Sequence, residues 1–123
     1  MRRLAGILLL LGAAVASAAP AVAGTTHSGK PQKRTVDVAD NYYSPKKLTV
    51  NLRSRITWKW TDEPADVHDV KLVSAPKGVK KFQSEPGSAG FSYSKTLTKP
   101  GTYKLICTFH EEDDMRMTIV VRH

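Results

Sequence analysis

The sequence contains a single cysteine, Cys107, so no disulfide can form within the chain. It also has only four histidines, no glycine-rich loop of the phosphate-binding kind, no Ser-His-Asp set and no internal repeat. These absences argue against nucleotide-dependent and serine-dependent catalysis. A lone cysteine in an exported protein has three main explanations, which are pairing between chains, a reactive thiol and a metal ligand.

Long hydrophobic runs are absent too, apart from one near the N-terminus. That run extends from Leu4 to Ala19 and follows Arg2-Arg3. It is too short to span a bilayer, which takes roughly 20 apolar residues. A basic start, an apolar stretch and small residues before an A-x-A site are typical of a signal peptide. We therefore predict a signal peptide over residues 1–23, Sec export to the periplasm or the extracellular space, and no transmembrane anchor.

The sequence lacks a continuous basic stripe, although its net charge is positive. Without Arg2 and Arg3, 17 of the 19 Lys and Arg residues remain against 11 Asp and Glu, which leaves a net charge of +6. Proteins that bind nucleic acid gather such residues on one face or along one helix. Here they are scattered through strand-like segments. We expect no nucleic-acid partner.

Helical periodicity is missing after the predicted signal peptide. Residues 24–33 contain no aliphatic or aromatic side chain and are expected to form a flexible leader. From Arg34 onward, short segments alternate between apolar and polar residues and are separated by prolines, a pattern typical of strands with one buried face. Seven segments share this pattern: 35–38, 48–52, 56–60, 70–73, 91–94, 103–106 and 117–121. The sequence predicts one all-β domain over residues 34–123, an antiparallel β-sandwich.

One group of residues near the C-terminus carries distinctive chemistry. Cys107, His110 and Met115 have the spacing C-x2-H-x4-M, and His68 precedes an earlier predicted strand. A thiolate, two imidazoles and a weak thioether are the donors of blue-copper electron-transfer sites. Each residue also has a simpler interpretation: a buried thiol, two surface or hydrogen-bonded histidines, and a core methionine. The joint spacing favours a copper site.

The segment from Val36 to Val121 resembles the plastocyanin and pseudoazurin group of cupredoxins. Three motifs carry the resemblance: Asn41-Tyr42-Tyr43-Ser44-Pro45 before Leu48-Thr49-Val50, Ile56-Thr57-Trp58-Lys59-Trp60 before His68-Asp69-Val70, and Lys99-Pro100-Gly101-Thr102-Tyr103 before Cys107 to Met115. The resemblance implies a Greek-key β-sandwich that holds one type 1 copper ion. It also implies the ligands His68, Cys107, His110 and Met115.

The sequence departs from this family's pattern at several positions. Asp69 follows the first ligand histidine where the family usually has asparagine, and an ionised carboxylate has no proton to donate. We therefore expect the Thr108 hydroxyl to donate to Asp69. Phe109 stands where proline is common, and Met117 offers a second thioether close to Met115.

The resemblance implies a single-electron carrier that exchanges electrons with a redox partner and is not an enzyme. Multicopper oxidases need about eight further histidines by resemblance to that family, and this sequence has four in all. Copper binding and delivery remains an alternative, because the ligand loop is strongly acidic. Eight acids are expected at the copper end: Asp62, Glu63, Asp66, Asp69, Glu111, Glu112, Asp113 and Asp114. We expect a monomer whose redox partner presents a positively charged docking surface.

Overall fold

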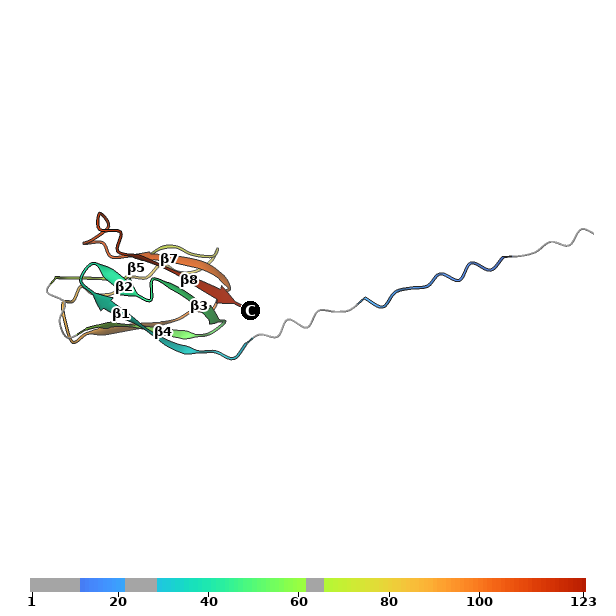
Figure 1. Ribbon diagram of the computed structural model, residues 1–123, viewed down its shortest axis with the longest axis horizontal. Coiled ribbons are helices and arrows are strands. Elements are labelled where there is room, and N and C mark those ends of the chain that lie inside the picture. Colours follow the sequence, from blue (N-terminus) through green and yellow to red (C-terminus); the bar gives the residue numbers. More distant parts are fainter. Residues whose placement is uncertain (1–11, 22–28, 62–65) are drawn as a thin grey trace, which may run out of the picture.

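A computed structural model describes residues 12–21, 29–61 and 66–123 (Figure 1). Residues 12–21 are exposed and have no regular secondary structure. Most of the predicted signal peptide, its cleavage site and residues 24–28 of the predicted leader lie outside the described residues. Within the described ranges, no helix has the length and hydropathy needed to cross a membrane.

Strands are the only regular secondary structure in these ranges, and they form two facing sheets (Figure 1). The eight strands are β1 (Lys33–Ala39), β2 (Tyr42–Ser44), β3 (Lys47–Asn51), β4 (Arg55–Trp60), β5 (Lys71–Ser74), β6 (Ser92–Thr96), β7 (Gly101–Ile106) and β8 (Arg116–Arg122). One sheet has the order β2-β1-β4-β6 and the other β3-β8-β7-β5. The predicted all-β sandwich is confirmed, and β2 is a short strand that the sequence pattern missed.

The prediction that all strands pair antiparallel was wrong for two pairs. β1 pairs parallel with β4, with Val36 opposite Trp58, and β3 pairs parallel with β8, with Val50 opposite Val121. The remaining four strand pairings in the described ranges are antiparallel. Alternation within a segment reports which face is buried, whereas strand direction depends on how the chain crosses between the two sheets.

The core lies between the inner faces of the two sheets. In β4 every second residue is fully buried: Ile56, Trp58 and Trp60. The opposing β8 contributes Ile119 and Val121 in the same alternating manner. Burial of one such large apolar side chain contributes about 1.5–3 kcal/mol, so the strand pattern and the core stabilise each other. This rigid sandwich supports the loops at its ends.

Part of the predicted leader is attached to the domain. β1 begins at Lys33, one residue before the predicted domain start. The Gln32 amide donates a hydrogen bond of 2.8 Å to the Ser54 hydroxyl, and the Asn51 side-chain amide donates one of 2.9 Å to the Lys30 carbonyl. Residues 30–33 therefore belong to the packed structure.

Candidate metal centre

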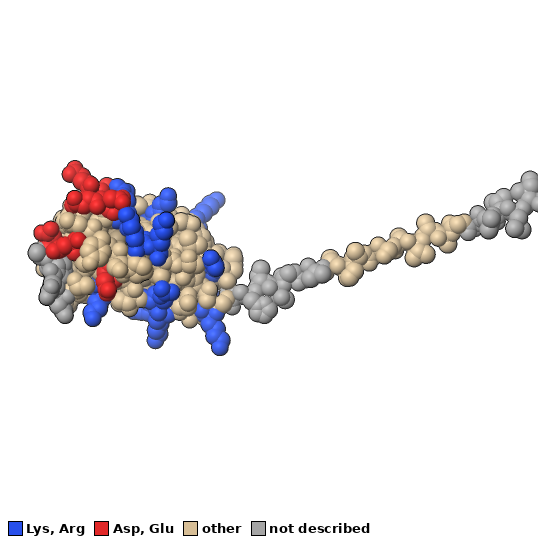
Figure 2. All heavy atoms as spheres, viewed as in Figure 1, with Lys and Arg blue, Asp and Glu red and all other residues tan. Residues whose placement is uncertain are grey.

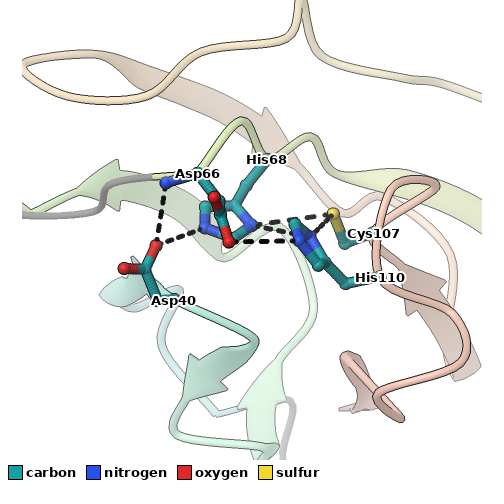
Figure 3. Close-up of polar contacts among 5 residues, drawn as sticks. All are labelled: Asp40, Asp66, His68, Cys107 and His110. Carbon is teal, nitrogen blue, oxygen red and sulfur yellow. Dashed lines mark hydrogen bonds and ion pairs between the residues drawn. The ribbon is translucent and has the colours of Figure 1, made fainter.

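Three potential metal donors meet at the end of the sandwich away from the C-terminus (Figures 1 and 3). Cys107 follows the last residue of β7, and His110 lies in the loop between β7 and β8. His68 comes from a different loop, where it forms an isolated β-bridge with Gly87 just before β5. Residues 39 or more positions apart in the sequence are thus brought together by the pairing of β5 with β7.

The three donor atoms form a compact triangle. The Nδ1 atoms of His68 and His110 are 3.1 Å apart, and the Cys107 Sγ lies 3.9 Å from the first and 3.5 Å from the second. Zinc in proteins bonds to nitrogen at ~2.0–2.1 Å and to sulfur at ~2.3 Å, which sets neighbouring donors roughly 3.3–3.8 Å apart. The 3.5 Å distance lies within this range, and the 3.1 Å and 3.9 Å distances lie just outside its two ends, so small side-chain shifts would let the triangle hold a small first-row metal ion by one sulfur and two nitrogens.

Backbone hydrogen bonds shape the loop that carries two of these donors. The Cys107 amide donates to the Met115 carbonyl at 3.0 Å, and the Met115 amide donates back to the His110 carbonyl at 3.2 Å. Asp114 adopts a left-handed conformation with φ of 56°, which turns the chain into β8. The loop is therefore closed on itself, so the positions of its donors are set by the strand frame.

The two methionines near the site have different surroundings. Both Met115 and Met117 are buried. The Trp58 indole N–H donates to the Met117 Sδ at 3.1 Å, so this sulfur already has a partner in the core. Met115 precedes β8, and its backbone is bonded to both Cys107 and His110. These contacts favour Met115 over Met117 as the fourth donor.

A buried carboxylate links the two loops of the site. Asp69 is 1% exposed, and its Oδ1 and Oδ2 accept hydrogen bonds of 2.7 Å from the amide and the hydroxyl of Thr108. The predicted donation from Thr108 to Asp69 is confirmed. The sequence did not reveal Gln83, whose side-chain amide donates to Oδ2 at 2.7 Å. Three donors satisfy the charge of a buried carboxylate that would otherwise be costly.

Two further acids, which the sequence did not single out as contacts of the histidines, lie against the outer ring nitrogens. The Asp40 Oδ1 is 3.0 Å from the Nε2 of His68, and the Asp66 Oδ2 is 3.7 Å from the Nε2 of His110. Asp40 lies in the turn between β1 and β2, 28 positions before His68. No local sequence signal marks such a pair, since it depends on how the two sheets face each other.

Burial determines the ionisation of the central thiol. Desolvation raises the pKa of Cys107 above its usual value, although hydrogen bonding to neighbouring backbone groups partly opposes this. Desolvation also raises the pKa of Tyr43, whose hydroxyl donates to the Asp69 carbonyl. The raised pKa favours the protonated thiol at neutral pH, and a metal ion bound here would displace its proton.

Within the described part of the chain, the site reaches solvent at His110. The His68 side chain is fully buried, whereas 14% of the His110 side chain is exposed. Beside it, Phe109 is 54% exposed. Figure 2 shows carboxylates gathered at this end of the sandwich and basic side chains over the rest of the visible face.

The fold and the donor set together define a class of protein. A small β-sandwich that holds one thiolate and two imidazoles between loops at one end is the architecture of a cupredoxin, whose donors bind a single copper ion.

Comparison with known proteins gives the family. Residues 31–122 match the model of the copper binding proteins of the plastocyanin/azurin family, and the chain belongs to this family. It is 31% identical over 122 residues to plastocyanin from Prochlorothrix hollandica, covering 94% of this chain and 86% of that protein.

Solved structures agree with this assignment. A reduced amicyanin variant superposes with a TM-score of 0.60 and 28% identity, covering 73% of this chain and 82% of the other. A purple cupredoxin from Nitrosopumilus maritimus gives a TM-score of 0.60 at 18% identity, covering 72% and 98%, which shows the shared fold alone.

Proposed function

We propose that the protein carries single electrons on one copper ion held by His68, Cys107, His110 and Met115. The observation that carries this proposal is the triangle of Nδ1, Nδ1 and Sγ atoms, all within 4.8 Å of one another. When bound, copper supplies a centre that cycles between Cu(I) and Cu(II). The donor set accommodates both oxidation states.

The surrounding structure supports electron transfer because it holds the donors in place without a metal. Hydrogen bonds join Cys107 to Met115, and the Asp69 carboxylate ties the loop of Thr108 to that of His68. A preorganised site moves little when its charge changes. The partly exposed edge of His110 and the exposed ring of Phe109 provide the contact surface through which electrons pass to a partner.

We also propose that the redox partner presents positive charge to this end of the molecule. Glu111, Glu112 and Asp113 are exposed beside the site. Two of the expected acids contribute less negative charge to this surface than predicted. Asp69 is buried, and Asp114 forms ion pairs with Lys46 at 2.7 Å and with Arg116 at 3.2 Å. Asp62 and Glu63 lie outside the described residues.

Export also belongs to this proposal. Residues 1–23 have the layout of a signal peptide, and the mature protein would act as a monomer in the periplasm or outside the cell. Copper delivery, the alternative suggested by the acidic loop, gains no support from the geometry. The donors are closed in by backbone bonds, and one of the four loop acids forms ion pairs with basic residues.

The visible spectrum tests the proposal. Copper added to the mature protein should give an intense blue thiolate-to-copper band that dithionite bleaches and ferricyanide restores over repeated cycles. The Cys107→Ser variant should show no such band even when it binds copper. A colourless wild-type protein, or a band that survives in Cys107→Ser, would reject the assigned site.

A further inference from the structure

The fully buried His68 ring has a distinct contact at each nitrogen (Figure 3). Its Nδ1 faces the donor triangle, 3.1 Å from the Nδ1 of His110 and 3.9 Å from the Cys107 sulfur. Its Nε2 faces the opposite way and lies 3.0 Å from the Asp40 Oδ1. The ring therefore bridges the donor triangle and a carboxylate from another part of the fold.

The chemistry of this pair sets the tautomer of His68. An ionised carboxylate only accepts hydrogen bonds, so the proton of a neutral His68 ring must lie on Nε2, pointing at Asp40. The lone pair is then on Nδ1, the atom that faces Cys107 and His110. The contact with Asp40 thus presents the correct nitrogen to a metal before any metal arrives.

Asp40 is itself held in position. It directly follows β1, in the sheet that does not carry Cys107, and the next residue, Asn41, has a left-handed φ of 68°. The Asp66 amide donates to the same Asp40 Oδ1 at 3.2 Å. Because Asp40 is anchored by the sheet opposite Cys107, it joins the two halves of the sandwich across the site.

We propose that Asp40 is a positioning residue that fixes the His68 tautomer and, through its charge, stabilises Cu(II) relative to Cu(I). This inference rests on the proposed copper function. A carboxylate hydrogen-bonded to a ligand imidazole raises the basicity of that ligand. The Asp40 side chain is 42% exposed, so solvent weakens its field, and the effect is that of one screened charge.

Two substitutions separate charge from orientation. Asp40→Asn keeps an oxygen that can accept from the Nε2 of His68 and from the Asp66 amide, but it removes the charge. Asp40→Ala removes both the accepting oxygen and the charge. Asp37→Asn is the matched control, since Asp37 is an exposed carboxylate on β1, the strand that Asp40 directly follows, three positions away.

The experiment combines nitrogen-15 NMR of the metal-free mature protein with the reduction potential of the copper-loaded form. In Asp40→Asn the Nε2–H tautomer of His68 should persist, while the ratio of Cu(II) to Cu(I) affinity should fall about tenfold. This fall is equivalent to a rise of ~59 mV in the reduction potential. In Asp40→Ala the tautomer should become mixed, and copper affinity should fall about 10–100-fold.

Two results would overturn the assignment of Asp40. One is a potential in Asp40→Asn that shifts no more than in Asp37→Asn. The other is an unchanged His68 tautomer in Asp40→Ala. The NMR measurement needs no copper, so a failure of the copper proposal, shown by a wild-type protein that binds none, remains distinguishable from a failure of the role of Asp40.

Discussion

Replacing Thr108 by valine tests how the buried Asp69 is stabilised. The substitution removes the hydroxyl that donates to the Asp69 Oδ2 at 2.7 Å, but it keeps the backbone amide that donates to Oδ1. Gln83 still donates to Oδ2. The carboxylate therefore loses one of three hydrogen bonds at almost unchanged side-chain volume.

The expected cost follows from the surroundings. A hydrogen bond to a charged group contributes about 1.5–3 kcal/mol, and the lower end applies because Thr108 is exposed and water can partly replace its hydroxyl. A loss of about 1.5 kcal/mol in a domain of this size lowers Tm by about 6–12 °C. Urea unfolding and thermal scans of the metal-free mature protein measure both quantities.

Thr102→Val provides the control. Thr102 is an exposed residue of β7, and its substitution should change stability by less than about 0.5 kcal/mol. If Thr108→Val proves no more destabilising than Thr102→Val, then the Thr108 hydroxyl is not needed to satisfy Asp69, and the account of this link between the two loops is wrong.

Three further predictions concern the metal ligand, pH and partner docking. Met115→Leu should keep the blue band and raise the reduction potential, because a weak donor to Cu(II) is lost. Met117→Leu should leave the potential unchanged and lower the free energy of unfolding by about 1 kcal/mol, because the hydrogen bond from Trp58 is lost. If voltammetry shows the larger shift in Met117→Leu, the fourth ligand is misassigned. The metal-free protein should lose stability as pH rises above about 8.5, because the pKa values of Cys107 and Tyr43 are raised in the folded state and the unfolded chain therefore releases these protons at lower pH. Urea titrations at several pH values measure this decline, and Cys107→Ser should flatten the part of it that begins at the lowest pH. Electron-transfer rates with a cationic partner should fall as salt shortens the screening length to ~8–10 Å. Replacing Glu111, Glu112 and Asp113 by the corresponding amides should slow association in stopped-flow mixing without removing the blue band. Rates insensitive to both changes would exclude docking by charge.

Local pattern was sufficient for most of the strands because each buries one face. The alternation in 56–60 reports Ile56, Trp58 and Trp60, which are fully buried in β4. β2 was missed because Tyr42–Ser44 is too short to show a period. The parallel pairings of β1 with β4 and of β3 with β8 depend on crossovers between sheets, which leave no local signal.

The site shows the same division between local and distant information. The spacing of Cys107 and His110 marks a ligand loop, and the carboxylate at Asp69 called for a donor, which Thr108 supplies. The contacts of Asp40 and Gln83 could not be predicted in this way. Each joins residues 14 or more positions apart through loop geometry that only the packed sandwich defines.

The most direct test of the copper site is a crystal structure of the copper-loaded mature protein with anomalous diffraction recorded at the copper edge. We expect one strong anomalous peak between the Nδ1 atoms of His68 and His110 and the Cys107 sulfur, with the Met115 sulfur as the more distant neighbour. A peak at the acidic loop or at Met117, or none inside the triangle, would contradict this expectation.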